Sequence, residues 1–388
     1  MLKKEELKDL MDLQKREILF NNILIQLKNF SNLQDIHYYK FETSEGTIPI
    51  IKIAKSLNPE EIRYVKVFIG AQHNEYNGLF GIIEFLRMIE ISTIQIDDLL
   101  ENDQMLLFAP LMNPYGFLNP RKDNKSGYFL RNGTNLNRYW RKTFAPDYKT
   151  GVSDSNLDPI PEHATVLKRI LEKYWNKDEI SIYILDFHET SLFEKFTINL
   201  INNLYKNSIT YKFSHWLEEG IIHNIIKLNN IKYTKKPLFY KCNSNASHSH
   251  INLTIKQLAT VYQKLQEYVS ANNKKLPFYF CYSNRSKEFC QLLAQNVYEK
   301  LKDILWETSF PAFYHNFNDH GCFVNMNDAT ERKQIYSMEL ETLKQFFNIF
   351  DEIEKVNADM NYYNKKVKIF DMSTQLVVES ILQMLKLF

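Results

Sequence analysis

The sequence has few cysteines, no long apolar run and almost no net charge. Its 4 cysteines include no Cys-x-x-Cys pair, which argues against a disulfide scaffold and suits a reducing compartment. The 48 basic residues nearly balance the 46 acidic ones, so the charge does not indicate nucleic acid or an anionic membrane as the main partner. No stretch approaches the roughly 18 consecutive apolar residues of a membrane-spanning helix, which excludes such a span.

Charged residues stand at the start of the chain, where an export signal would need apolar ones. Residues 1–10 read MLKKEELKDL, so we expect no signal peptide and a cytoplasmic location. A chain of 388 residues is long enough for one large core or two ordinary ones. We expect an N-terminal helical extension over residues 1–35 and a single further domain over residues 36–388.

The most informative stretch is GAQHNEYNG, at residues 70–78. An alternating apolar strand at residues 63–69 leads into it, and residues 79–88 after it have apolar side chains at helical spacing. The stretch is therefore a strand-to-helix turn, where α/β enzymes place their chemistry outside the carboxyl ends of strands. It offers Gln72 and Glu75, three residues apart, as polar donors.

Further segments repeat the pattern of a strand that ends in polar residues. An apolar strand at residues 105–109 precedes the Asn-Pro-Tyr-Gly turn at residues 113–116, and RNGTNLNR follows at residues 131–138. Another strand, at residues 181–187, delivers His188 at its end. Because carboxyl ends of parallel strands meet at one edge of a sheet, these side chains are candidates for a common site.

The last strand of the series is short and ends in Glu339, after residues 334–338. In chain order the motifs are a polar turn, Asn-Pro-x-Gly, Asn-Leu-Asn-Arg, Asp-Phe-His and a strand followed by Glu. This order resembles the zinc metallocarboxypeptidases, the carboxypeptidase A-like superfamily, from about Thr47 to about Leu343. The resemblance implies an α/β fold with a mixed, twisted central β-sheet, helices on both faces and an insertion after the third metal ligand.

The resemblance implies one zinc ion held by Gln72, Glu75 and His188. The family has His at the position of Gln72; an amide oxygen is neutral, as imidazole is, but it is a weaker zinc donor. A Gln ligand also occurs in the murein DL-carboxypeptidases of this superfamily. His73 is the competing first ligand, since it shares a face with Glu75 if the turn is extended. Asp186, on the strand face of His188, would orient that ligand.

Four residues match the catalytic and substrate-binding positions of the family. Glu339 would be the general base that takes a proton from the attacking water and returns it to the leaving amine, with Glu341 as second candidate. Asn137 and Arg138 resemble the pair that holds the substrate's terminal carboxylate, which a guanidinium fork binds through two hydrogen bonds. Arg131 is the candidate for stabilising the oxyanion of the tetrahedral intermediate.

Several weaker candidates accompany these residues. Arg121 is the alternative to Arg131 as the oxyanion-stabilising residue. Asn135 stands where the family more often has Asp, and Tyr314 is the nearest candidate for the family's assisting Tyr. His248 and His250 have no acidic or Cys partner nearby, so we interpret them as part of a solvated loop rather than a second metal site.

Between Leu192 and Trp306 the chain departs from the family's compact spacing. We expect an insertion at about residues 193–305 and a C-terminal helix at about residues 373–388. The elements predicted within the insertion are helices near 210–228, 254–270 and 287–304 and a strand at 276–282. Such an insertion would elaborate the same domain over the cleft.

These motifs predict a zinc-dependent carboxypeptidase or amidase that hydrolyses an amide bond beside a free carboxylate in a peptide or muropeptide. Within the hydrolases, the alternative is the succinylglutamate desuccinylase and aspartoacylase branch, which acts on N-acyl amino acids. From a different class, the alternative is a zinc-free binding protein that keeps the Arg138 clamp without catalysis. We expect a peptide or small acyl-amino-acid substrate and no nucleic-acid or membrane partner.

Overall fold

A computed structural model describes most of the chain. The described residues are 4–144, 159–190, 209–212, 225, 228–230, 250–253, 255–271, 275–282, 284–306, 312–314, 322, 324, 334–343 and 358–387.

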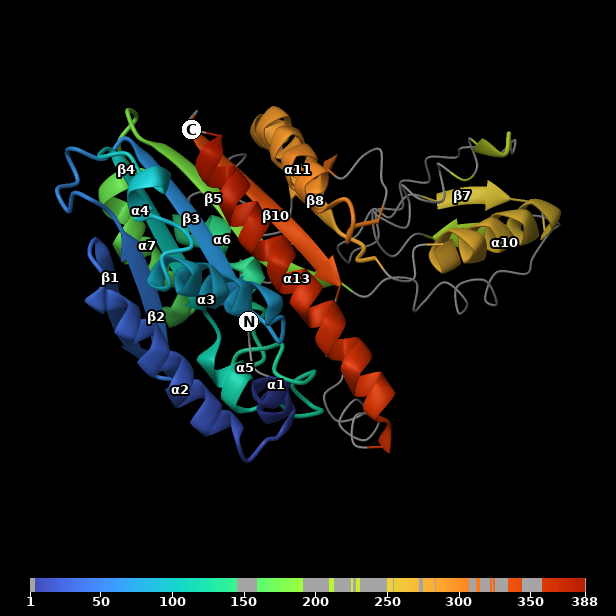
Figure 1. Ribbon diagram of the computed structural model, residues 1–388, viewed down its shortest axis with the longest axis horizontal. Coiled ribbons are helices and arrows are strands. Elements are labelled where there is room, and N and C mark those ends of the chain that lie inside the picture. The colour runs from blue at the N-terminus through green and yellow to red at the C-terminus, as the bar shows by residue number, and fades with distance from the viewer. Residues whose placement is uncertain are drawn as a thin grey trace.

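The fold is built on an eight-stranded sheet in the order β1-β2-β4-β3-β5-β10-β8-β9 (Figure 1). The strands are β1 (Ile36–Thr43), β2 (Gly46–Ile53), β3 (Tyr64–Ala71), β4 (Gln104–Leu111), β5 (Ser181–Thr190), β8 (Tyr279–Tyr282), β9 (Ala312–Tyr314) and β10 (Ile335–Leu343). Strands β4, β3, β5 and β10 run parallel, whereas β1, β2 and β8 pair antiparallel with β2, β4 and β10. A separate two-stranded sheet pairs β6 (Ile209–Lys212) with β7 (His250–Leu253).

Helices cover both faces of the large sheet. The helices of the described chain are α1 (Lys4–Met11), α2 (Arg16–Asn29), α3 (Asn77–Glu90), α4 (Ile96–Leu99), α5 (Pro114–Leu118), α6 (Trp140–Phe144), α7 (Glu162–Trp175), α10 (Ile255–Ala271), α11 (Lys287–Leu301) and α13 (Met360–Lys386). Of these, α10 lies beside β7 of the small sheet (Figure 1). Successive side chains of β3 point to opposite faces. Phe68 therefore joins the apolar cluster under α2, α3, α11 and α13, while Val67 and Ile69 join the one under α6 and α7. The predicted mixed α/β fold with two helical layers is confirmed.

The α3 helix lies close to both the sheet and α13 because it has small residues at its contacts. A Cβ atom on Gly81 would overlap the Val377 side chain of α13, and one on Gly78 would come within 2.6 Å of Phe187 Cβ in β5. Side chains at these positions would push α3 away from its neighbours. The two glycines thus let the helix after the polar turn pack tightly beside the candidate site.

The structure corrects the predicted bounds of several elements. The C-terminal helix begins at Met360 rather than near residue 373, and β10 continues past Glu339 to Leu343. Residues 209–212, at the start of the helix predicted near 210–228, form a strand, and most of that segment lies outside the described residues. Apolar periodicity alone does not separate a short strand from a helix, which explains this error. The proposed division into an extension and one domain stays a prediction.

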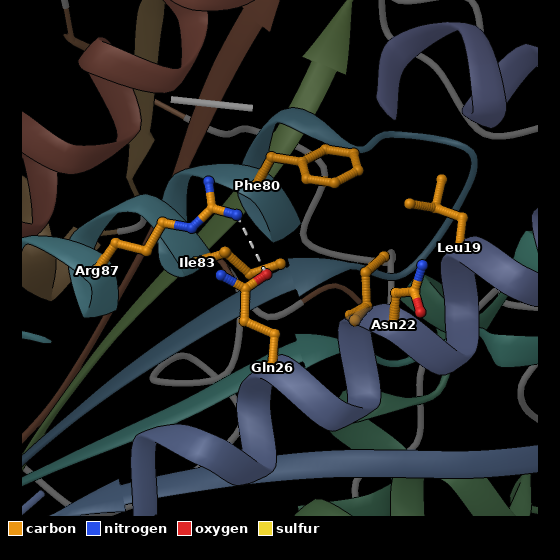
Figure 2. A pocket seen from close by; sticks show the side chains of 7 residues that line it. Leu19, Asn22, Gln26, Phe80, Ile83 and Arg87 are labelled. Carbon is orange, nitrogen blue, oxygen red and sulfur yellow. Dashed lines mark hydrogen bonds between the residues drawn. The ribbon is translucent and has the colours of Figure 1, made fainter. Parts of the chain in front are cut away.

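The N-terminal helix α2 packs against α3 on the outer side of the fold. Figure 2 shows a small pocket between the two helices, where Arg87 Nη2 donates to Gln26 Oε1 at 3.3 Å. Its lining includes Leu19 and Phe80 but none of the predicted site residues. Within the described part of the chain, no helix is long and apolar enough to cross a membrane.

Candidate active site

Three parallel strands bring residues from distant parts of the sequence to one edge of the sheet. In the register of β3, β5 and β10, Ile69 pairs with Asp186, and Asp186 pairs with Glu339. Two residues further along, Glu341 pairs with His188. The polar turn after β3 therefore lies next to the polar ends of β5 and β10, as the carboxyl ends of parallel strands require.

His188 is at the centre of this cluster. Its Nδ1 atom lies 2.8 Å from Glu75 Oε2, and its Nε2 atom lies 2.9 Å from Asp186 Oδ2 and 3.9 Å from Glu339 Oε1. Burial alone would lower the pKa of His188, but the charges of Asp186 and Glu339 and its hydrogen bonds to carboxylates outweigh that effect and raise the pKa well above its ordinary value. The structure thus brings predicted ligands Glu75 and His188 into direct contact.

The carboxyl groups of the cluster are buried together with little basic charge. Burial raises the pKa of Asp186, Glu339 and Glu341, and repulsion among the carboxylates adds to this, whereas His188 lowers all three. Glu339 and Glu341 also share a side-chain hydrogen bond. A further positive charge in the cluster would therefore stabilise the ionised carboxylates.

Gln72 is held at both ends of its amide group. Its Nε2 atom donates to Asp186 Oδ1 and Oδ2, at 2.7 and 2.6 Å, while its Oε1 atom accepts from Trp140 Nε1 at 2.6 Å. Asp186 therefore contacts both Gln72 and His188. Since an amide oxygen has two lone pairs, Gln72 Oε1 keeps one acceptor position besides the bond to Trp140.

His73, the competing first ligand, packs on Tyr128. The two rings stack with centroids 4.1 Å apart and planes at 14°, and His73 Nδ1 lies 3.1 Å from Tyr128 O. The His73 ring centroid is 5.8 Å from that of His188. Both candidates for the first ligand therefore lie near His188, and of the two it is Gln72 that contacts Asp186.

The predicted carboxylate clamp lies directly beside His188. Asn137 Nδ2 is 3.2 Å from His188 Nε2, and Asn137 is buried. Arg138 Nη1 donates to Asn137 O at 3.0 Å and to Cys322 Sγ at 3.1 Å. These contacts place Asn137 in the cluster and fix one edge of the Arg138 guanidinium next to it.

The two candidates for oxyanion stabilisation lie elsewhere. Arg131 is exposed; its guanidinium stands 5.3 Å from the Tyr115 ring centroid and its backbone N–H donates to Glu45 Oε2 at 3.0 Å. Arg121 Nη2 donates to Tyr115 Oη at 2.8 Å. In the contacts of the described residues, neither arginine reaches His188, so the oxyanion role of Arg131 stays a prediction.

Sequence reasoning missed three side chains of the cluster: Trp140, Tyr128 and Cys322. Trp140 follows the Asn-Leu-Asn-Arg motif by two residues, and this proximity was the signal available. The other two come from loops whose approach to the site depends on tertiary structure. Among the weaker candidates, Tyr314 lies in β9 and His248 is outside the described residues. The loop predicted around His250 is wrong at that residue, because His250 begins β7.

The donor chemistry of the cluster fits a divalent cation. Glu75 Oε2 and His188 Nδ1 face each other across 2.8 Å, and Asp186 holds the other imidazole nitrogen, as carboxylates commonly do for metal-binding histidines. No three His, Cys, Asp or Glu side chains among the described residues form a group able to hold a metal. The choice between Gln72 and His73 as the third protein donor stays a prediction.

Several solved structures are similar to this chain at low identity. A provisionally assigned carboxypeptidase A from Shewanella denitrificans OS-217 matches 94% of this chain and 69% of its own, at 12% identity and a TM-score of 0.47. A metallo-carboxypeptidase from Burkholderia cenocepacia matches 92% of this chain and 67% of its own, at 11% identity and a TM-score of 0.43. Bovine thrombin-activatable fibrinolysis inhibitor, in complex with a tick carboxypeptidase inhibitor, matches 95% and 96%, at 11% identity and a TM-score of 0.46.

Comparisons at the level of sequence find nothing. No protein-family model matches the sequence, and no curated protein is similar to it. Identities of 11–12% and TM-scores below 0.5 carry no information about the substrate of this chain.

Proposed function

We propose that this chain is a metal-dependent hydrolase that cleaves an amide bond beside a free carboxylate in a peptide, a muropeptide or an N-acyl amino acid. The observation that carries the proposal is the convergence of Glu75 from the turn after β3, His188 from β5 and Glu339 from β10 on one buried cluster, with the Asn137–Arg138 pair beside it. A proton-transferring carboxylate, a cation site and a carboxylate clamp are the parts that such a hydrolysis needs.

Each residue of the cluster has a distinct role in the proposed reaction. Glu339, buried and with a raised pKa, takes a proton from the attacking water and returns it to the leaving amine. Arg138 and Asn137 hold the free carboxylate of the substrate. Asp186 orients His188 and Gln72.

Gln72, Glu75 and His188 would hold one zinc ion. The chemistry that zinc supplies when bound is Lewis acidity, which favours attack of water on the amide carbonyl. Imidazole and carboxylate donors suit zinc, whereas the neutral amide of Gln72 is a weak donor, so we expect weaker binding than at a site with two imidazoles.

Metal analysis combined with hydrolysis tests this proposal. We expect stoichiometric zinc in protein purified without chelator, and hydrolysis of peptides with a free carboxyl terminus but not of their carboxamides. Glu339→Gln should keep the zinc and lower kcat by about 100-fold or more, as loss of general acid–base catalysis does. Glu75→Ala should lose both zinc and activity.

A matched control is Glu162→Gln on α7, an exposed carboxylate that accepts hydrogen bonds from the backbone N–H and the hydroxyl of Ser44, which is not a residue of the cluster. It should change neither zinc content nor activity. Protein that contains no metal at saturating zinc would contradict the proposal.

The geometry of Gln72 also favours a second candidate function, a zinc-free binding protein for carboxylate-bearing ligands. With Nε2 on Asp186 and Oε1 on Trp140, Gln72 is satisfied as a structural residue. In that case chelator treatment should leave ligand binding unchanged, and Glu75→Ala should not abolish it. Loss of binding on zinc removal would eliminate this candidate.

A further inference from the structure

A second set of buried polar residues lies on the side of the sheet opposite to the side chain of His188. Successive side chains of a strand point to opposite faces, so Glu189 in β5 faces away from the His188 imidazole. In β10, Thr342 likewise faces away from Glu341. Glu189 and Thr342 are paired in the register of the two strands, and both bond Asn77, the first residue of α3.

Hydrogen bonds among these residues join α3, β5 and β10. The backbone N–H of Asn77 donates to Glu189 Oε1 at 2.7 Å, and its Nδ2 atom donates to Thr342 Oγ1 at 2.8 Å. Thr342 Oγ1 donates in turn to the backbone oxygen of His188 at 3.1 Å. Asn77, Glu189 and Thr342 are 1%, 7% and 1% exposed, so water competes little for these bonds. We call Asn77, Glu189 and Thr342 the triangle.

The hydroxyl of Thr342 both accepts and donates within the triangle. It carries a single hydrogen, and since Asn77 Nδ2 is a donor, that hydrogen goes to the backbone oxygen of His188. Valine would fill nearly the same space but could neither accept nor donate, whereas serine would keep both bonds. The chemistry of the hydroxyl can therefore be separated from the packing of the side chain.

The triangle fixes the two chain segments that carry the predicted ligands in contact. Asn77 lies two residues after Glu75, and Thr342 holds the backbone carbonyl of His188. Asp186 contacts the imidazole of His188, whereas the triangle holds the backbone from which that imidazole projects. Because zinc bonds its ligands at nearly fixed lengths, a small shift of one segment against the other would weaken binding.

We propose that the triangle positions the metal site: it fixes the turn that carries Glu75 against the strand that carries His188, and so sets how tightly these side chains hold a divalent cation. The inference rests on the zinc site of the proposed function. It needs neither hydrolysis nor a choice between Gln72 and His73 as the third donor. The carboxylate of the triangle also stands at the N-terminus of α3, where the helix dipole stabilises a negative charge.

Zinc binding by two variants of Thr342 tests the role of its hydroxyl. Thr342→Val should raise the zinc dissociation constant by about tenfold, measured by competition with a chromophoric chelator, as the loss of a contact that orients a metal ligand commonly does. Thr342→Ser keeps the hydroxyl and should bind zinc within about threefold of the parent protein. With Co²⁺ in place of zinc, the visible absorption should change in Thr342→Val and stay as in the parent protein in Thr342→Ser.

A double-mutant cycle tests whether Asn77 acts through Thr342. Asn77→Ala should by itself raise the zinc dissociation constant by about tenfold, and it carries the test alone if Thr342→Val does not fold. In the Thr342→Val background the same substitution should add less than about threefold, because the two side chains share one hydrogen bond.

Ser380→Ala on α13 is the matched control. Ser380 is buried, and its hydroxyl donates to a backbone carbonyl, that of Leu376, at 2.7 Å, as the hydroxyl of Thr342 does to His188. Ser380→Ala should lower the free energy of unfolding in urea and leave zinc affinity and the Co²⁺ spectrum unchanged. A merely structural triangle would give this same pattern in Thr342→Val.

The outcomes separate this inference from the proposed function. If the parent protein binds no zinc, the proposed function and the inference both fail. If the parent binds zinc but Thr342→Val or Asn77→Ala binds it equally well, or if Thr342→Ser binds it as weakly as Thr342→Val, only the positioning role is overturned. Full additivity in the cycle overturns it too. Zinc affinities that change as expected in a protein that hydrolyses nothing would leave the inference standing and refute the hydrolase.

Discussion

Gln72 is the single residue on which the proposed metal site depends most. Its amide replaces an imidazole of the resembled family and bridges Asp186 and Trp140. A neutral amide keeps the charge of the cluster unchanged, but it binds zinc more weakly than imidazole nitrogen. If Gln72 is the ligand, its amide therefore sets how tightly the proposed site would hold zinc.

Replacing Gln72 with His should tighten zinc binding. An imidazole at this position would donate one ring N–H to Asp186 and present the other nitrogen to the metal, so we expect the zinc dissociation constant to fall at least about tenfold. Competition with a chromophoric chelator measures this. Since Trp140 would lose its acceptor, stability should fall by about 1–3 kcal/mol.

His73→Ala is the comparison variant for this experiment. If Gln72 is the ligand, His73→Ala should bind zinc as the parent protein does. If His73→Ala abolishes zinc binding while Gln72→His changes nothing, His73 is the first ligand and the assignment of Gln72 is wrong.

At the scale of elements, β3 and α13 are joined through a buried lysine. Lys66, fully buried on β3, donates to Leu385 O in the last turn of α13 at 3.2 Å and to Gln104 Oε1 at 3.3 Å. A cation near a helix C-terminus interacts favourably with the helix dipole. Burial nevertheless lowers the pKa of Lys66 from 10.5 to about 8.

This lowered pKa predicts that stability depends on pH. Below about pH 8 the folded chain carries the buried ammonium of Lys66, which destabilises it. Between about pH 8 and pH 10.5 the folded chain loses this proton while the unfolded chain still binds it, so the destabilisation disappears as the pH rises. The free energy of unfolding should therefore gain up to about 3 kcal/mol from this group over that range. Urea denaturation at pH 7.5 and pH 10 measures it.

Lys66→Met isolates the contribution of this lysine, since other groups titrate over the same range. The gain in unfolding free energy between the two pH values should be smaller in the variant than in the parent protein. Equal gains in both proteins would show that Lys66 is not the cause.

At the scale of the whole molecule, the N-terminal helices share one core with the sheet. Leu19, Ile23 and Leu27 of α2 belong to the same buried cluster as Phe68 and Phe108 of the sheet. Arg16, also on α2, is 1% exposed. Its Nη1 donates to Tyr76 Oη at 3.1 Å and to Phe117 O at 2.7 Å. Tyr76 directly follows the predicted ligand Glu75, so α2 anchors the chain next to the site.

Arg16→Met should therefore destabilise the whole fold. The variant loses two buried hydrogen bonds, so the free energy of unfolding in urea should fall by about 1–3 kcal/mol. Lys15→Met is the matched control, because Lys15 is exposed and its ion pair in the described chain is with Asp9. Exposed ion pairs contribute about 1 kcal/mol at most. A parent-like Arg16→Met would show that α2 is not anchored by this contact.

Much of the cluster was predictable because parallel strands and the turn after β3 carry its residues. The alternation of apolar residues before Gln72 and before His188 predicts two parallel strands, and parallel strands bring their carboxyl ends together. The contact of Glu75 with His188 and the position of Glu339 near both agree with that expectation. Element bounds were less predictable, since β10 extends beyond Glu339 and the C-terminal helix begins at Met360.

The sequence by itself determined the mixed α/β class and the set of polar residues at the strand ends, because apolar periodicity and local spacing are properties of neighbouring residues. Tertiary structure alone decided the direction of each polar side chain. Only the packed fold brings Trp140 to Gln72, Asn135 to Tyr128 and Cys322 to Arg138. Hydrogen-bond partners of this kind are distant in sequence or lie in loops, and no periodic pattern records them.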